Sequence, residues 1–380
     1  MNRPTILVTG AIGKTGGAVV SQLREQGWPV RAVVRARDAR SARLDRLGAE
    51  TVVADLHDPD QMRNAMQGTT RAYYCPPFDP YMIESASVFA VAARAAKLET
   101  IVMLSQWLAS PAHPALLTRQ HRLVDRLFAT IPGMALTVVN PGFFADDYPT
   151  VFGMAAQLGT FPSPYGDSRN APPSNEDIAR VAVAALTDPG KHAGKRYRPT
   201  GPTLLSADDM AGILGRVLRR KVRKMEMPLW LFLKAARLQG RGAFEMSSFR
   251  HYILDHQQGA FAVGAPTADV AEVTDRSPED FATIARRYAA TPEAQRTVGN
   301  RMQAIMDLLR TPVSPGYDLD RFDRQQGFPV PPQPQFALQD ERWKIEHDPL
   351  GGPSEAACSR EGAGRSPIRG RDNGATARPA

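Results

Sequence analysis

Short apolar runs alternate with helical patterns through the first 145 residues. A short continuous apolar run is typical of a strand that is buried on both faces of a parallel sheet. Six such strands with helices between them predict a doubly wound, parallel α/β sheet, whose ligands lie at the carboxyl ends of the strands. The expected strands are 6–8, 30–34, 51–54, 71–75, 100–104 and 135–139, and the helices start near 18, 59, 83 and 115.

The first strand leads into a glycine-rich turn, ILVTGAIGKTGG, in which Gly10, Gly13 and Gly16 recur at three-residue spacing before a helix. Glycine allows the tight turn, the approach of backbone N–H groups to a pyrophosphate, and close packing of helix on strand. The phosphates would lie at the positive helix end. A nucleoside-triphosphatase loop ending in the G-K-T at 13–15 would need glycine in place of Val8, so we exclude it. A turn that binds nothing remains an alternative.

The second strand ends at Arg35, with Arg31 and Arg37 nearby and Lys14 in the turn. In a dinucleotide-binding (Rossmann) fold an acid at this place bonds the ribose 2′-hydroxyl of NAD, whereas an arginine suits the 2′-phosphate of NADP. Guanidinium and ammonium groups pair well with a phosphate dianion. We therefore expect NADP(H) to be preferred over NAD(H), the alternative being that these are solvated surface charges.

The composition of the 380 residues excludes several classes of protein. Cys75 and Cys358 are the two cysteines, which argues against a disulfide framework or a Cys-based zinc site and suits the reducing cytoplasm. No run of about 18 apolar residues and no signal-peptide pattern occur, so we expect no membrane span and no metal. The net charge of +8 invites a nucleic-acid partner. The basic run at 216–224 lies at the end of a predicted helix, where cations complement the dipole, so we favour a solvated face.

The domains expected are a dinucleotide-binding core over 1–145 and a smaller α+β substrate lobe over 146–310, with some chain returning to the core. Three S-x-x-D capping boxes predict helix starts in the lobe, at Ser174, Ser206 and Ser277, with Pro278 at the first position of the last helix. Short strands are expected at 195–199 and 222–227.

The last 70 residues differ from the rest. Prolines disfavour regular structure over 311–350, which we expect to be extended. Residues 351–380 are rich in Gly, Ser, Arg, Ala and Pro and are expected to be a disordered tail. The molecule is expected to be a monomer or a homodimer.

Several segments together resemble the NmrA-like branch of the atypical short-chain dehydrogenases/reductases. They are TGAIGKTG, AVVR, IVMLS, VVNPGFFADD and the stretch from NEDIARVAVAAL to LLSADDMAGIL, and they occur in the family's order over residues 4–290. The resemblance implies a Rossmann domain that binds NAD(P)H and a small substrate lobe. Some members reduce quinones, dyes, enones or imines, and others bind the dinucleotide and regulate partners.

The resemblance also implies a departure from ordinary short-chain dehydrogenases, which use Ser, Tyr and Lys. Ser105 stands at the serine position, His121 aligns with the lysine and Leu117 with the tyrosine. Leu117 cannot donate a proton. His121 is the best remaining acid, since its ordinary pKa lies near neutrality. It could instead only bond the ribose or be a surface histidine, and Ser105 could be a strand-end turn residue. Ser105 and His121 are our catalytic candidates.

The expected dinucleotide contacts follow strand ends or lie in the glycine turn. Asp55 would bond the adenine edge or start an Asx turn. Trp107, Phe143 and Phe144 would form an apolar substrate wall or pack between the lobes. The full expected set is Gly10, Ala11, Ile12, Gly13, Lys14, Thr15, Gly16, Arg35, Asp55, Leu56, Pro76, Pro77, Ser105, His121, Pro141, Gly142 and Phe143.

Two functions fit these features. The first is an NADPH-dependent reductase of a small conjugated acceptor such as a quinone, enone, dye or iminium, since such acceptors delocalise the charge that hydride transfer creates. The second is a non-catalytic NADP(H) sensor that acts through protein partners. Other tyrosines could donate a proton if they reach the cleft, namely Tyr73, Tyr74, Tyr81 and Tyr148.

Overall fold

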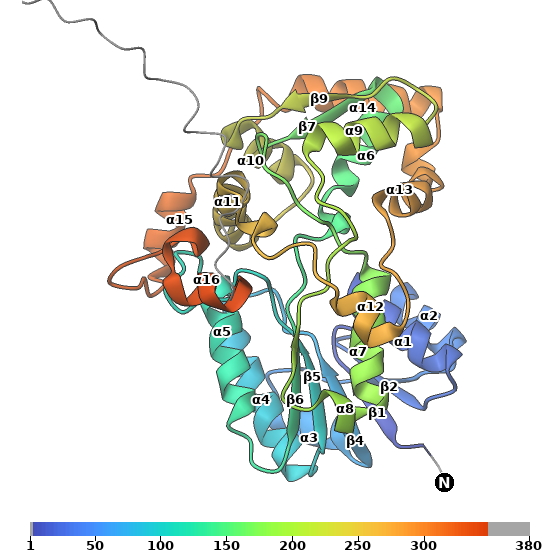
Figure 1. Ribbon diagram of the computed structural model, residues 1–380, viewed down its shortest axis with the longest axis vertical. Helices are drawn as coiled ribbons and strands as arrows, with labels where there is room; N and C mark the ends of the chain where they lie inside the picture. The colour runs from blue at the N-terminus through green and yellow to red at the C-terminus, as the bar shows by residue number, and fades with distance from the viewer. Residues whose placement is uncertain (1–2, 349–380) are drawn as a thin grey trace, which may run out of the picture.

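A seven-stranded parallel sheet forms the lower half of the molecule in Figure 1. The computed structural model describes residues 3–348, except the side chains of 147 and 149–151. The strand order is β3-β2-β1-β4-β5-β6-β8, so the expected doubly wound parallel fold is confirmed. The strands are β1 (Thr5–Val8), β2 (Val30–Val34), β3 (Glu50–Val53), β4 (Thr69–Tyr74), β5 (Thr100–Leu104), β6 (Ala135–Val139) and β8 (Arg196–Tyr197).

Helices cover both faces of this sheet, which is why β1, β5 and β6 are almost entirely apolar. Successive side chains of β1 point to opposite faces: Ile6 and Val8 join one buried cluster and Leu7 joins the other. The first cluster lies under α1 (Lys14–Glu25), α2 (Ala39–Arg46), α7 (Asn175–Thr187) and α12 (Asp269–Thr274). The second lies under α3 (Pro59–Met66), α4 (Met82–Ala95) and α5 (Leu116–Ala129).

The upper half in Figure 1 is a smaller lobe built around a two-stranded parallel sheet, β7 (Thr160–Ser163) with β9 (Arg223–Glu226). An aromatic-rich core joins its helices. These are η1 (Ala145–Asp147), α6 (Pro149–Leu158), α9 (Ala207–Val217), α10 (Leu229–Leu238), α11 (Ala243–Gln258), η2 (Ala260–Ala262), α13 (Phe281–Ala289), η3 (Pro292–Ala294) and α14 (Val298–Arg310). Between the lobe segments, α7, α8 (Pro189–His192) and β8 return to the large sheet.

Helix caps decide where several of these helices begin. Ser174 and Ser206 cap α7 and α9 through hydrogen bonds from the N–H groups of Asp177 and Asp209, as expected. The expected start at Ser277 is wrong. The carboxylate of Asp280 accepts from the N–H of Thr283, and this competing cap starts α13 at Phe281, beyond Pro278.

The C-terminal segment returns from the lobe to the large domain and is not simply extended. It contains α15 (Leu319–Gln326), η4 (Ala337–Gln339) and α16 (Glu341–His347), and Figure 1 shows α16 beside α5. The buried indole of Trp343 donates to the carbonyl of Trp107 at 3.0 Å, and Ser110 donates to Asp340 at 2.5 Å. Capping and side-chain burial thus overcome the prolines. The expected disordered tail, 351–380, lies outside the described residues.

Two further expectations concern the described chain as a whole. None of the helices between residues 3 and 348 combines the length and apolar character that a bilayer crossing requires. In the same range, no cluster of His, Cys, Asp or Glu is arranged to hold a metal ion. The basic run is partly used within the lobe, because Lys224 pairs with Asp167 and Glu226 and Arg220 donates to the carbonyl of Ala156.

Candidate functional site

The glycine turn is packed so closely that Gly10 and Gly16 have no room for a side chain. Gly10 has φ +62°, and a Cβ there would lie 2.9 Å from the Cβ of Cys75. A Cβ on Gly16 would lie 2.3 Å from the carbonyl oxygen of Gly10. The turn is closed by the N–H of Gly13, which donates to Gly10 at 2.9 Å. Helix α1 therefore approaches β1 as closely as a dinucleotide-binding turn requires.

The N-terminus of α1 is open to a ligand. Its N-cap is Gly13, which has no side chain to accept from the first-turn N–H groups, and Gly13 and Lys14 are exposed. Unsatisfied N–H groups and the positive end of the helix dipole suit a diphosphate. Together with the close approach of helix to strand that Gly10 and Gly16 allow, this fits the diphosphate of a nicotinamide dinucleotide.

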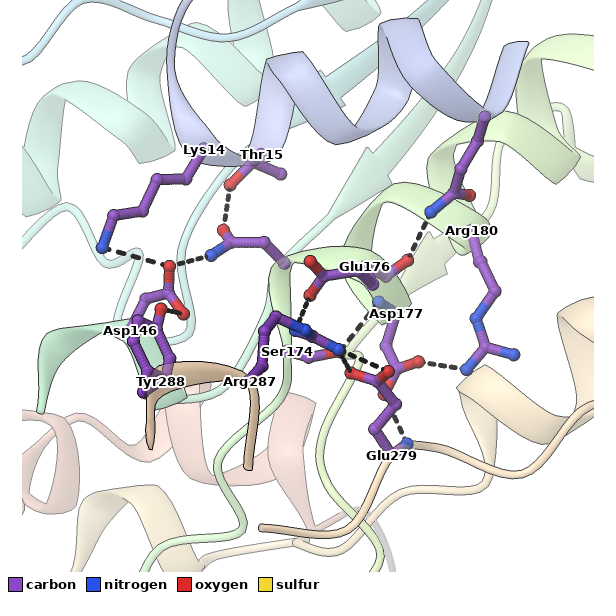
Figure 2. Close-up of polar contacts among 12 residues, drawn as sticks. Lys14, Thr15, Asp146, Ser174, Glu176, Asp177, Arg180, Glu279, Arg287 and Tyr288 are labelled. Atoms are coloured by element: carbon purple, nitrogen blue, oxygen red, sulfur yellow. Dashed lines mark hydrogen bonds and ion pairs between the residues drawn. The ribbon is translucent and has the colours of Figure 1, made fainter. Parts of the chain in front are cut away.

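A polar node lies beside the turn and links four elements (Figure 2). The carboxylate of Asp146 is 3.1 Å from the ammonium group of Lys14, and it also accepts from the Asn175 amide and the Tyr288 hydroxyl. The Thr15 hydroxyl donates to the side-chain amide oxygen of Asn175 at 2.6 Å. Lys14 and Thr15 belong to the first turn of α1, whereas Tyr288 belongs to α13 of the lobe. The node therefore joins the turn to the substrate lobe.

A second set of contacts in Figure 2 ties α13 to the start of α7. Arg287 pairs with Glu176 at 2.5 Å and with Glu279 at 2.6 Å. Asp177 pairs with Arg180 and accepts from the N–H of Glu279 at 2.7 Å. These contacts fix the lobe relative to the large domain close to the glycine turn.

The end of β2 presents Arg35 to solvent. Its side chain is 72% exposed and lies 3.7 Å from Asp79, a contact too long and too exposed to hold it firmly. Arg37 donates to the Thr51 carbonyl and pairs with Asp45 at 3.2 Å. Arg31 pairs with Glu50 and donates to the carbonyls of residues 65 and 67, which directs it away from the end of the strand. Arg35 is thus the arginine best placed for a phosphate.

The residues after β3 and β4 also lie at this sheet edge. Asp55 accepts from the N–H of His57 at 3.0 Å, so the Asx turn is present, and its side chain is exposed. Leu56 packs partly into the core, Pro76 is half-buried and Pro77 is buried.

The two catalytic candidates are buried at the end of β5 and on α5. The hydroxyl of Ser105 and the Nδ1 atom of His121 have no hydrogen-bond partner within residues 3–348. Burial lowers the pKa of His121 to about 3, so its imidazole is neutral near pH 7. Burial raises the pKa of the nearby Asp125, although the guanidinium of Arg196, at 2.9 Å, opposes that rise. His121 is therefore not a charged imidazolium acid near neutral pH.

The expected apolar wall is packed inside the protein. Trp107 donates to the carbonyl of Ala260 at 3.0 Å and is buried, and Phe143 is buried among aromatic residues of the lobe. Phe144 packs against the core of the large domain. Pro141 and Gly142 are buried as well. Trp107, Phe143 and Phe144 were expected either to line a substrate pocket or to pack between the lobes, and in the structure they pack.

Comparison with known families matches residues 2–259 to the NmrA-like family. The chain belongs to the NmrA-like family. The resemblance of its sequence segments is therefore confirmed.

Individual relatives extend this placement. This NmrA-like chain is 30% identical over 297 residues to an NAD(P)H azoreductase of Xenophilus azovorans. The aligned region covers 75% of this chain and 98% of that protein. Its fold matches the NADPH complex of a quinone oxidoreductase of Escherichia coli with a TM-score of 0.65 at 20% identity, over 74% of this chain and 99% of that one. It also matches NmrA, a negative transcriptional regulator, in complex with NADP, with a TM-score of 0.61 at 15% identity over 78% and 100% of the two chains.

Sequence reasoning missed several residues of this NmrA-like site. Asp146 and Tyr288 meet at Lys14 although they lie 142 positions apart, and Asn175, which begins the segment NEDIARVAVAAL, was not singled out. Asp125 sits one helical turn after His121, and that spacing was the one available sign that it shares the face of α5 that meets Ser105.

Proposed function

We propose that this protein is an NAD(P)H-dependent oxidoreductase that prefers NADPH and reduces a small conjugated acceptor such as a quinone, enone, dye or iminium. The observation that carries the proposal is the glycine turn, whose open helix N-terminus lies at the same sheet edge as the exposed Arg35. The azoreductase relative, which is matched over 98% of its length, supports a reductase rather than another use of the fold.

The chain's own residues would bind and orient the dinucleotide. The N–H groups at the start of α1 would hold the diphosphate, and Lys14 would add a charge-assisted contact. Arg35 would pair with the 2′-phosphate, and this contact would favour NADPH. The nicotinamide supplies hydride chemistry when bound. Ser105 and His121 would border its ribose or the acceptor, with His121 acting as a neutral hydrogen-bonding group because of its low pKa.

The acceptor class follows from the chemistry that these groups can support. A simple ketone needs a proton at once, whereas a conjugated acceptor spreads the negative charge that hydride addition creates. Since neutral His121 is a weak acid source, conjugated acceptors are favoured.

The test is a calorimetric titration with NADPH and NADH, repeated with Arg35→Glu, followed by an assay of NADPH oxidation against quinones and dyes. We expect wild type to bind NADPH more tightly, Arg35→Glu to lose at least tenfold for NADPH and little for NADH, and one acceptor to be reduced. Arg63→Glu, at an exposed arginine paired with Asp60, is the matched control. Equal loss for both cofactors in Arg35→Glu would contradict the NADPH preference.

A second candidate function is an NADP(H) sensor that acts through protein partners. The observation in its favour is the burial of Ser105 and His121, which are the two expected catalytic residues. Tight NADPH binding with no acceptor reduced would support this function and end the reductase proposal.

A further inference from the structure

The outer end of the substrate lobe is formed by α14, whose apolar side chains lie on the solvent side. In Figure 1 this helix lies at the top of the lobe, on the side away from the large sheet. All 13 of its residues are described, and Ala304 alone among them is buried. The outer face carries large apolar side chains that are between 36% and 83% exposed, namely Val298, Met302, Ile305, Met306, Leu309 and, on the turn after the helix, Val313.

These side chains form one continuous band, which we call the α14 stripe. A spacing of four, three and four residues separates Val298, Met302, Ile305 and Leu309. Since an α-helix has 3.6 residues per turn, this spacing brings all four side chains to the same face. Met306 is four residues from Met302 and three from Leu309, so it widens the stripe.

The opposite face of α14 is more polar. It lines a groove against α6 and α10, and there it contributes the side chains of Asn300, Gln303 and Asp307. A helix that packs only against its own domain normally turns its apolar side inward. The polarity of α14 is reversed, so the stripe is placed to contact something outside the described part of the chain.

Arginines lie beside the start of the α14 stripe. Burial lowers the pKa of the Arg220 guanidinium, and the positive charges of Arg296 and Arg301 lower it further. The three arginines are therefore neighbours, although Arg220 belongs to the turn before β9. Arg301 directly precedes Met302 of the stripe. The basic run noted in the sequence at 216–224 thus meets α14.

Another cation lies beside the other end of the stripe. Lys234 of α10 donates to the carbonyl of Pro312 at 2.6 Å, next to Val313. Its ammonium group lies 5.4 Å from the ring centre of Trp230, which is exposed. Tryptophan and lysine are side chains that proteins place where lipid headgroups meet water.

The carboxylates near α14 do not balance these cations. Glu293 and Asp307 line the groove on the opposite face of the helix. On β9, Lys224 already pairs with Asp167 and Glu226. The surface around the stripe is therefore apolar in the middle and positive at both ends, and it complements a surface that is both apolar and negative.

Two other occupants fit this surface less well. A second copy of the chain would bring a second set of arginines, and the carboxylate that α14 carries, on Asp307, faces the groove. The C-terminal residues 349–380 have Leu350 and Ile368 as their large apolar side chains, which are too few to cover the stripe. A bilayer with anionic headgroups supplies phosphates for the cations and acyl chains for the stripe.

We propose that the α14 stripe and the cations beside it bind the surface of a bilayer that contains anionic phospholipids. The helix would lie in the plane of the membrane, with the stripe among the upper acyl chains and the arginines at the phosphates. The protein would rest on the membrane without crossing it. Because α14 lies away from α1 and the glycine turn in Figure 1, the dinucleotide site would stay accessible. The proposal does not depend on the reductase function.

The test is co-sedimentation of the full-length protein with two kinds of vesicle, one of phosphatidylcholine alone and one of phosphatidylcholine mixed equally with phosphatidylglycerol. We expect binding to the second kind and little to the first, and release as salt is added, because salt screens the charges. The double variant Met302→Ser/Leu309→Ser should lower the partition coefficient roughly tenfold or more, because it removes two side chains that enter the lipid. Arg296→Gln/Arg301→Gln should also lower it roughly tenfold or more, because it removes two charges.

Matched controls lie on α4 of the large domain. Val91→Ser changes an exposed apolar residue there, and Arg94→Gln changes an exposed arginine. Each control should leave vesicle binding unchanged. Thermal unfolding of every variant checks that a loss of binding is not a loss of folding.

Three results would overturn the proposal. The first is wild type that stays in solution with the anionic vesicles. The second is vesicle binding that Met302→Ser/Leu309→Ser leaves unchanged or that the α4 controls weaken equally, since another part of the chain would then carry it. The third comes from light scattering without lipid: a dimer that Met302→Ser/Leu309→Ser converts to a monomer would show that a second copy covers the stripe.

Discussion

Replacing Lys14 with methionine should weaken NADPH binding, and replacing its partner Asp146 with asparagine should strengthen it. In the structure the Lys14 ammonium lies 3.1 Å from Asp146, and 60% of the lysine side chain is exposed. A diphosphate at the start of α1 would have to draw Lys14 away from that carboxylate. The two ends of one ion pair are therefore expected to affect cofactor affinity with opposite signs.

The size of the effect follows from the exposure of the pair. A largely exposed ion pair contributes about 0.2–1 kcal/mol, whereas a hydrogen bond to a charged group contributes about 1.5–3 kcal/mol. The difference leaves Lys14 contributing about 1.5 kcal/mol to binding, so Lys14→Met should lose roughly tenfold in affinity. Asp146→Asn removes the competing charge but keeps an acceptor for Tyr288, and it should gain up to about fivefold.

The assay is a calorimetric titration with NADPH at low and high salt, with thermal unfolding as a check on folding. The difference between the variants should shrink at high salt because exposed charges are screened. Lys191→Met, at an exposed lysine of α8, is the control and should leave the affinity unchanged. The reasoning fails if Lys14→Met binds NADPH as well as wild type, or if Asp146→Asn weakens binding as much as Lys14→Met.

Three further predictions concern stability. Trp343→Ala should cost about 3–5 kcal/mol of the free energy of unfolding in urea, because it removes a buried indole. Ile345→Ala, at an exposed residue of the same helix, should cost less than about 0.5 kcal/mol. Similar costs would show that α16 does not hold the segment. Asp280→Ala should cost about 1 kcal/mol by removing the cap of α13, and Ser277→Ala should cost little; the reverse order would restore the start expected from the sequence. Finally, the melting temperature should fall as the pH drops below about 6.5, because burial lowers the pKa of four histidines to about 3 in the folded protein: His121, His251, His256 and His347. The unfolded chain binds their protons first, which costs roughly 2 kcal/mol of the free energy of unfolding for each histidine by pH 5. A constant melting temperature between about pH 7.5 and 5 would contradict this.

Local pattern was enough to predict the large domain. Strands buried on both faces are mainly apolar, so β1 to β6 were visible as short runs in the sequence. The glycine turn was also visible, because Gly10 needs a positive φ and Gly16 has no space for a Cβ. Both requirements act on the residue itself and leave a mark in the sequence. The position of Arg35 at a strand end followed from the same pattern.

The sequence did not decide which of two possible caps starts a helix. Ser174, Ser206 and Ser277 are each followed three residues later by an aspartate that could cap instead. The serine is the cap of α7 and of α9, whereas Asp280 is the cap of α13. The C-terminal segment shows a similar limit, since the burial of Trp343 against Trp107 depends on residues more than 200 positions away.

By itself, the sequence determined the parallel sheet, the turn that would hold a diphosphate and the membership of the NmrA-like family. Tertiary structure alone decided that Lys14 meets Asp146 and Tyr288, that Trp107 and Phe143 are packed between the lobes, and that Tyr148, among several tyrosines, lines a pocket. The physical reason is that backbone conformation and two-sided burial act through near neighbours in the chain. Hydrogen-bond partners and pocket walls are instead chosen when distant segments pack together.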